Sequence, residues 1–279
     1  MIKGQGSVII SVFSTTPGIG KTLAAINLAA RLAYSGNRVC LVDLDLQFGD
    51  VMHYLKLSSD KTIAKAQWEL KQNPNKFDIN NFLTSYTTSL FSFSIIPSPI
   101  YVRDAYQIDV LTVETIINDY LDDFDFIVLD LSSAFSSLNL AMLDLSTIIN
   151  YIGVIDFLPA LKNYKIGYDT LLRFEYEESK IRLIENRADS QKLIQSSDVE
   201  SLLGEQFYHR LPNDFQSANK SIQEGRPLIL SAPDSRLDRS FFELAMKYTG
   251  GTIPTTTVAE PEPQPKKGFF SQVLNVLFG

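Results

Sequence analysis

Apolar residues occur along the chain in short continuous runs, separated by stretches that have helical spacing. The run at residues 7–14 is β-branched and ends in a Gly-rich turn. Residues 22–34 then show apolar positions at helical spacing, which stop near Gly36. A second continuous run, residues 38–44, follows at once, as is typical of a parallel strand that is buried on both faces. The start of the chain therefore predicts a strand, a loop, a helix and a second strand.

Further strand-like runs continue this alternation. They lie at residues 91–96, 124–131, 151–155, 180–185 and 206–211. The stretches between them are long enough for helices, and strands that alternate with helices form a sheet with parallel crossovers. The pattern predicts an α/β fold: a doubly wound, mainly parallel sheet with helices on both faces.

The composition changes near the end of the chain. Residues 250–265 are rich in Pro, Thr and Glu, which predicts an extended, flexible linker. Residues 266–279 are apolar again after two lysines. The chain is therefore interpreted as a domain over residues 1–249, a linker over 250–265 and a separate tail over 266–279.

Composition and charge limit the possible functions. Two His and one Cys leave no material for a metal cluster or a disulfide framework, which favours a reducing, cytoplasmic compartment. The chain contains no run of 18 consecutive apolar residues, which is about the length needed to span a membrane. The net charge of −7 repels phosphate backbones, so DNA is an unlikely partner.

The Gly-rich turn has the pattern of a phosphate-binding loop. Such a loop needs small residues where backbone N–H groups approach phosphate oxygens, a Lys for the β- and γ-phosphates, and a hydroxyl ligand for Mg²⁺. Gly18, Gly20, Lys21 and Thr22 supply these groups between a predicted strand and helix. The predicted nucleotide-binding residues of this loop are Thr16, Pro17, Gly18, Ile19, Gly20, Lys21, Thr22 and Leu23. Its expected ligand is ATP with Mg²⁺.

Acidic residues end two of the predicted strands. Asp43 and Asp45 close the second strand, where carboxylates reach the crevice at the C-terminal edge of a parallel sheet. Asp130 ends the apolar run at 124–131, the pattern of a carboxylate that orders Mg²⁺. Asp after a strand is also an ordinary turn or cap residue. Their order along the chain, after Thr22, favours Mg²⁺ ligation by Thr22, Asp43 and Asp130, partly through water.

With these motifs the chain resembles the MinD/ParA group of P-loop proteins, whose deviant Walker A motif reads KGGxGKT and whose second strand ends in DxD. Within the group it looks most like the TadZ/CpaE pilus-assembly branch. The segments that carry this finer resemblance are 41–51 (LVDLDLQFGDV), 158–163 (LPALKN), 186–189 (NRAD), 211–214 (LPND) and 225–228 (GRPL).

The resemblance implies roles for single residues. Asp45 would position the attacking water and Lys21 would act on the phosphates, while Asn186 would read the adenine edge and Pro212 would pack near the base. Asn186 can also be read as an ordinary residue of a turn at the end of a strand. Thr16 stands where the group has a signature Lys, and Thr15 and Pro17 also depart from the consensus. A hydroxyl cannot supply a transition-state cation, so we expect slow or absent ATP hydrolysis.

The tail completes the functional hypothesis. On a helix, the aromatic and aliphatic side chains of residues 269–278 form one broad arc behind Lys266 and Lys267, which is the pattern of an interfacial membrane helix. Amphipathicity also fits docking on protein. The resemblance then implies an ATP-dependent homodimer at the inner face of the cell membrane that helps to localise a pilus or secretion assembly protein. A non-hydrolysing ATP-bound scaffold and a MinD-like or DNA-partitioning ATPase are the alternatives.

Overall fold

The computed structural model describes residues 6–189 and 194–251. Its described part contains one eight-stranded sheet in the order β3-β4-β2-β5-β1-β6-β7-β8. Only β3 and β4 pair antiparallel, and every other neighbouring pair is parallel. The strands are β1 Val8–Phe13, β2 Val39–Leu44, β3 Thr84–Thr87, β4 Ser92–Ile96, β5 Phe126–Leu131, β6 Ile148–Gly153, β7 Ile181–Glu185 and β8 His209–Arg210.

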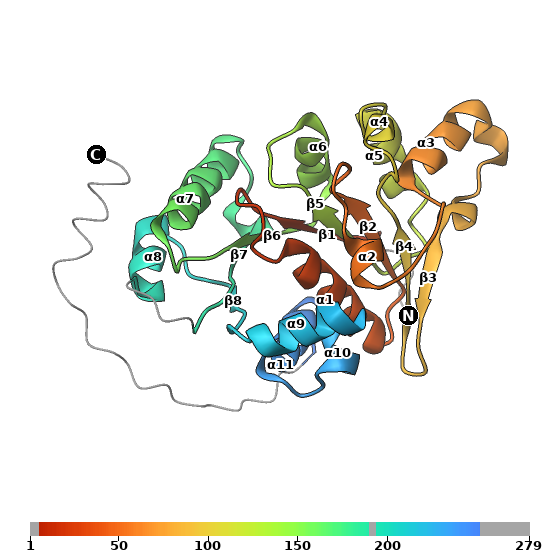
Figure 1. Ribbon diagram of the computed structural model, residues 1–279. Helices are drawn as coiled ribbons and strands as arrows, with labels where there is room; N and C mark the ends of the chain where they lie inside the picture. The colour runs from red at the N-terminus through yellow and green to blue at the C-terminus, as the bar shows by residue number, and fades with distance from the viewer. Residues whose placement is uncertain (1–5, 190–193, 252–279) are drawn as a thin grey trace.

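Helices cover both faces of this sheet (Figure 1). One face packs against α1, α2, α10 and α11, and the other against α3, α5, α6, α7 and α8. The helices are α1 Lys21–Tyr34, α2 Val51–Tyr54, α3 Ile63–Gln72, α4 Val102–Ala105, α5 Val110–Asp119, α6 Ser137–Leu145, α7 Leu158–Arg173, α8 Ser196–Leu203, α9 Phe215–Glu224, α10 Leu228–Ser231 and α11 Arg236–Thr249. The predicted fold class is therefore confirmed.

The central strands are continuously apolar because each of them packs against a hydrophobic core on both faces of the sheet. In β5, Val128 packs on the side of α1, whereas Ile127 and Leu129 pack on the side of α5 and α6. Successive side chains of a strand point to opposite faces, so a strand that is covered twice must be apolar at every position. The same rule explains β1 and β2.

The strand predicted at residues 151–155 was placed too late. The structure begins β6 at Ile148, and the polar Asn150 is a buried member of it. Its side chain accepts a hydrogen bond from the hydroxyl of Tyr248 in α11. The partner comes from a distant helix, so sequence pattern alone could not show why an Asn is tolerated there.

Two other strands differ from the pattern at the edges of the sheet. The run at residues 206–211 contains only the two-residue strand β8. This strand lies at the edge of the described sheet, where it pairs with β7, and Pro212 follows soon after it. Strand β3, with the polar sequence TSYT, was not predicted at all. It lies at the opposite edge, where the side chains of Ser85 and Thr87 are exposed and no apolar signal is needed.

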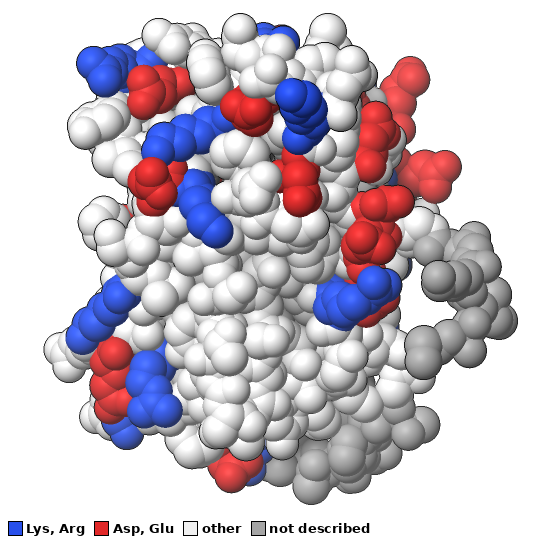
Figure 2. Space-filling model, turned by 90° about the vertical axis from the view of Figure 1, so that its right-hand side faces the viewer, with Lys and Arg blue, Asp and Glu red and all other residues white. Residues whose placement is uncertain are grey.

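The surface charge is uneven. Figure 2 shows one face with a broad uncharged area in its centre and charged side chains around it. This face carries no concentration of Lys and Arg of the kind that binds a nucleic acid backbone. Among the described residues, no helix is both long and apolar enough to cross a membrane. The predicted tail, and all of the predicted linker except Gly250 and Gly251, lie outside the described residues.

A buried ion pair joins the helix after the phosphate loop to the last helix. Arg31 of α1 donates from Nε to Asp238 Oδ1 of α11 at 3.0 Å, and its Nη2 contacts Oδ2. The side chain of Asp238 is only 1% exposed. Removal of the cation would leave an unpaired buried carboxylate.

We predict that Arg31→Met lowers the free energy of unfolding by about 3–5 kcal/mol, the usual cost of breaking a buried pair from one side. Urea denaturation followed by circular dichroism measures this difference. Asp60→Ala is the matched control, because its pair with Lys65 is exposed and should matter little. Equal midpoints for the two variants would contradict a stabilising role of the buried pair.

Candidate functional site

The phosphate loop connects the C-terminal end of β1 to the first turn of α1. Gly18 and Gly20 adopt left-handed backbone conformations, with φ of 72° and 97°, which residues with a side chain rarely adopt. Gly20 is the N-cap of α1, which begins at Lys21. The loop therefore presents backbone N–H groups at the positive end of a helix, the usual arrangement of an anion site.

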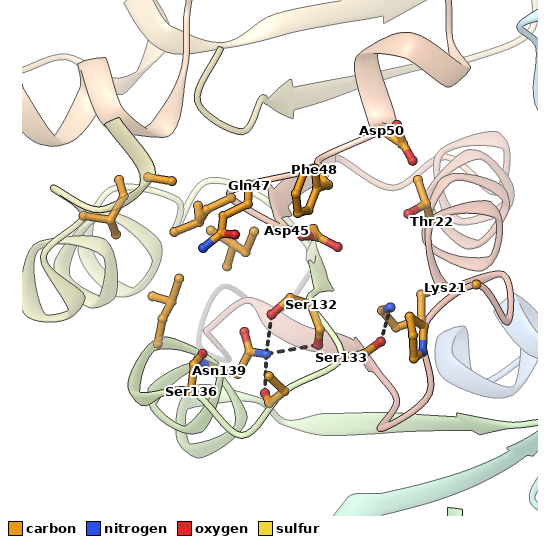
Figure 3. Close-up of a pocket in the computed structure, with 18 of the residues that line it drawn as sticks. Lys21, Thr22, Asp45, Gln47, Phe48, Asp50, Ser132, Ser133, Ser136 and Asn139 are labelled. Atoms are coloured by element: carbon orange, nitrogen blue, oxygen red, sulfur yellow. Dashed lines mark hydrogen bonds between the residues drawn. The ribbon is translucent and has the colours of Figure 1, made fainter. Parts of the chain in front are cut away.

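The loop opens onto a cavity of about 1090 Å³ at the C-terminal edge of the sheet (Figure 3). Three further segments complete its wall: the loop after β2, the loop after β5, and the region of α4 and α5. The lining includes Gly18, Gly20, Lys21, Thr22, Leu23, Asp45, Gln47, Phe48, Asp50, Ala105, Ile108, Ser132, Ser133 and Asn139. A volume of this size is sufficient for a nucleotide.

Lys21 is held by the loop after β5. Its Nζ donates a hydrogen bond to Ser133 Oγ at 2.6 Å. Asn139 of α6 fixes the same loop, because its Nδ2 donates to Ser132 O, Ser132 Oγ and Ala134 O at 2.7–3.0 Å. Figure 3 shows these contacts converging on the cavity. The phosphate-loop cation and the loop after β5 are thus directly linked.

Two carboxylates lie buried beneath the cavity. Asp43 and Asp130 are opposite each other on the adjacent strands β2 and β5, and both are 0% exposed. Burial raises the pKa of Asp130 to about 7, although the neighbouring Thr22 hydroxyl and the Lys21 ammonium oppose the shift. Burial also raises the pKa of Asp43, and the charge of Asp130 adds to this effect. The strand register alone brings these two acids together.

Asp43 also shapes the loop that follows β2. Its carboxylate accepts hydrogen bonds from the backbone N–H groups of Asp45 and Val51 and from the Ser98 hydroxyl, each at 3.3 Å. Gly49 lies so close that an added Cβ would be 2.5 Å from Asp43 Oδ2. Its hydrogen bonds make Asp43 a loop-positioning residue, and its proposed contact with Mg²⁺ stays a prediction.

Asp130 fits the requirements of a Mg²⁺ site. Within the described part of the chain, neither of its carboxylate oxygens has a hydrogen-bond partner. Those residues contain no group of three or more His, Cys, Asp or Glu that could hold a metal unaided. Mg²⁺ often binds through one or two carboxylates and phosphate oxygens while it keeps several waters, so such a group is not required. Thr22 and Asp130 would hold the ion, which would neutralise phosphate charge.

The structure adds acidic and polar residues that sequence reasoning missed. Asp45 lines the cavity as expected, but so does Asp50, the residue that precedes α2. Ser133 and Asn139 lie in the segment 132–139, which the resemblance implies is a second switch loop, but their individual contacts with Lys21 and Ser132 were not predicted. Asp50 is six residues beyond the end of β2, too far along the chain for its position at the cavity to be read from the strand pattern.

The predicted base-binding residues lie on the other side of the phosphate loop. Asn186 follows β7 and donates from Nδ2 to Ile19 O at 2.6 Å, and Pro212 follows β8. Neither residue lines the cavity. Contact of Asn186 and Pro212 with adenine therefore stays a prediction.

The unusual residues of the loop have structural partners. Thr15 Oγ1 lies 2.8 Å from the Tyr151 hydroxyl and donates to the carbonyl of Asn163 in α7 at 2.8 Å. The backbone N–H of Thr16 donates to Ser14 Oγ at 3.1 Å. Pro17 is exposed at the cavity and has no N–H to offer. The phosphate-binding N–H groups must therefore come from Gly18 onward.

Comparison with known proteins identifies a matching family and a protein of similar sequence. The family model described as AAA domain matches residues 7–155, which include the phosphate loop and both buried carboxylates. In sequence, the chain is similar to the septum site-determining protein MinD of Thermotoga maritima. The two are 23% identical over 285 residues, which cover 96% of this chain and 99% of that protein.

Solved structures share the fold. A ParA family ATPase from Chlorobium tepidum TLS superposes with a TM-score of 0.77 at 22% identity and covers 86% of this chain and 99% of its own. The septum site-determining protein MinD from Pyrococcus horikoshii OT3, in complex with Mg-ADP, superposes with a TM-score of 0.73 at 19% identity. That match covers 87% of this chain and 96% of the other. The fold is that of the MinD/ParA P-loop ATPases.

The raised pKa of Asp130 predicts a pH-dependent stability. Because its folded value of about 7 exceeds the unfolded value of 3.8, the folded state binds the proton more tightly. This contribution is present at low pH and is lost as the pH rises through 7. We expect Asp130→Asn to raise the stability of the ligand-free protein by a few kcal/mol at pH 8 and to change it little at pH 4.

Thermal unfolding of wild type and variant at both pH values measures the effect. Asp45→Asn serves as the control, because the Asp45 carboxylate lies at the open cavity. This variant should not show the same gain in stability at pH 8 relative to pH 4. An Asp130→Asn variant that is less stable than wild type at pH 8 would contradict the raised pKa of the buried Asp130.

Proposed function

The chain belongs to the AAA domain family, and from that membership we propose that it is an ATP-binding, dimerising switch associated with a membrane. The observation that carries the proposal is a phosphate loop next to the buried carboxylate of Asp130, whose oxygens have no hydrogen-bond partner within the geometric limits among residues 6–189 and 194–251. The loop provides N–H groups for phosphate, and Asp130 and Thr22 provide oxygen ligands for Mg²⁺. The Mg-ADP bound to the similar Pyrococcus horikoshii protein supports the choice of ligand.

The proposed switch couples the nucleotide to two loops. Lys21 is bonded to Ser133, so a phosphate that recruits Lys21 releases or redirects the loop after β5. Asp43 holds the loop that carries Asp45 and Asp50 at the same cavity. Binding of Mg-ATP would therefore change both loops together, and these loops form the surface on which we expect a second copy to dock.

ATP turnover is proposed to be slow. Asp45 would position the attacking water, and Lys21 would stabilise charge on the phosphates. Thr16 supplies no cation where the resemblance places a lysine, so a large part of the transition-state stabilisation is missing. The same residue favours a second candidate function, an ATP-bound scaffold that does not hydrolyse its nucleotide. Phosphate release in a single turnover distinguishes the two.

Membrane recruitment is proposed through residues 266–279. Their two lysines and apolar arc fit an anionic lipid surface, and so short a segment should bind weakly alone. A dimer presents two tails and gains avidity. We propose that this places the ATP-bound dimer at the inner face of the cell membrane, where it localises a pilus or secretion assembly protein as in the TadZ/CpaE branch.

The experiment is sedimentation with vesicles that contain anionic lipid, in the presence of Mg-ATP, Mg-ADP or no nucleotide. We expect more than tenfold stronger vesicle binding with Mg-ATP, because dimerisation doubles the number of tails. Deletion of residues 266–279 should abolish vesicle binding and leave ATP binding intact. Light scattering on the same samples reports the dimer.

Lys21→Ala is the control that removes the nucleotide response and keeps the tail. It should show only the weak, nucleotide-independent vesicle binding of a monomer. Vesicle binding that is the same in all nucleotide states, or that survives loss of the tail, would contradict the proposed switch. Binding to DNA that falls steeply with salt would instead favour a partitioning role.

A further inference from the structure

The turn that follows β7 lies against the outer side of the phosphate loop. Asn186 donates from Nδ2 to Ile19 O at 2.6 Å, and Arg187 donates from Nη2 to Gly18 O at 3.4 Å. Two consecutive carbonyl groups of the loop thus meet two consecutive side chains of the turn. We refer to Asn186 and Arg187 together as the clamp.

The Asn186 amide uses both of its ends in this contact. While Nδ2 donates to the phosphate loop, Oδ1 accepts the backbone N–H of Arg187 at 2.9 Å. Gly20 makes room for the approach, because a Cβ at that position would lie 3.0 Å from Asn186 Nδ2. Gly20 therefore serves both the left-handed turn of the loop and the close contact with Asn186.

Backbone hydrogen bonds to two neighbouring strands anchor the clamp. The N–H of Asn186 donates to Gly153 O at the end of β6, at 2.7 Å, and the N–H of Ala188 donates to Leu211 O beyond β8, at 2.9 Å. Arg187 itself has a φ of 56°, in the left-handed region that residues with a side chain seldom adopt. Such a conformation persists where surrounding contacts enforce it, and it occurs often at functional sites.

The direction of these bonds gives the clamp a function. In an anion-binding loop the N–H groups must point inward, so the carbonyl groups point outward and need partners of their own. The clamp supplies those partners at Gly18 and Ile19. A loop that is already oriented loses less conformational entropy when the anion binds.

We propose that Asn186 and Arg187 are positioning residues that preset the phosphate loop for the polyphosphate chain of a nucleotide, whatever base the nucleotide carries. This inference rests on the proposed function. It adds to the expected contact of Asn186 with adenine a contribution that does not depend on the base. The ligand class recognised through the clamp is a Mg²⁺-bound polyphosphate.

Calorimetric titration with Mg-ATP, Mg-GTP and Mg-tripolyphosphate tests the proposal. Asn186→Ala should weaken binding of all three ligands by a similar factor, about tenfold for the loss of one such hydrogen bond. Arg187→Gly removes the second contact and suits the positive φ, so it should weaken all three by a smaller common factor. Arg236→Gln is the matched control: it removes an exposed Arg paired with nearby Asp189 and should leave all three affinities unchanged.

Hydrogen exchange of the ligand-free proteins gives a second readout that does not involve any ligand. Exchange of the amides at residues 18–22 should be faster in Asn186→Ala than in wild type and unchanged in Arg236→Gln. Loss of ATP affinity alone, with tripolyphosphate binding and exchange as in wild type, would overturn the clamp and leave Asn186 as a reader of adenine. If wild type bound none of the three ligands, the proposed function would fail, and the exchange experiment would still decide whether the clamp exists.

Discussion

Two buried carboxylates set the physical constraint on which this site depends. Parallel pairing of β2 with β5 fixes Asp43 opposite Asp130, and both lie without solvent beneath the phosphate loop. Burial raises the pKa of each side chain, and the nearby Lys21 opposes this for Asp130 only in part. A bound divalent cation would compensate the negative charge of these buried carboxylates, and a phosphate chain would bind the same ion from the other side. The fold thus places the phosphate loop directly above the two carboxylates that we propose as the cation site.

Hydrogen bonds also connect the site to the two loops that line the cavity. Asp43 holds the loop after β2 through hydrogen bonds to its backbone, so the position of that loop depends on the charge at the strand end. The loop after β5 is tied to Lys21 through Ser133 and to α6 through Asn139. Each loop has one attachment that an incoming Mg²⁺-phosphate would compete with or reinforce. Under the proposed switch, these attachments would make the surface formed by the two loops depend on the bound nucleotide.

Local patterns in the sequence predicted much of the fold and the centre of the site. Continuous apolar runs predicted the central strands, and the loop from Gly18 to Thr22 was recognisable because phosphate binding restricts residue types at each position. Features that depend on distant partners were not predictable. Asn150 is acceptable in β6 only because Tyr248 of α11 meets it. In the same way, the contact of Asn186 with Ile19 joins residues 167 positions apart.

The proposed function requires that the phosphate loop and Asp130 together bind Mg-ATP. Calorimetric titration of the full chain with ATP, in Mg²⁺ and in EDTA, is the most direct measurement. We expect binding with Mg²⁺ that weakens at least tenfold in EDTA, because the buried Asp130 then remains without its cation. Binding that is equally strong in EDTA, or no binding in Mg²⁺, would contradict this joint role of the loop and Asp130.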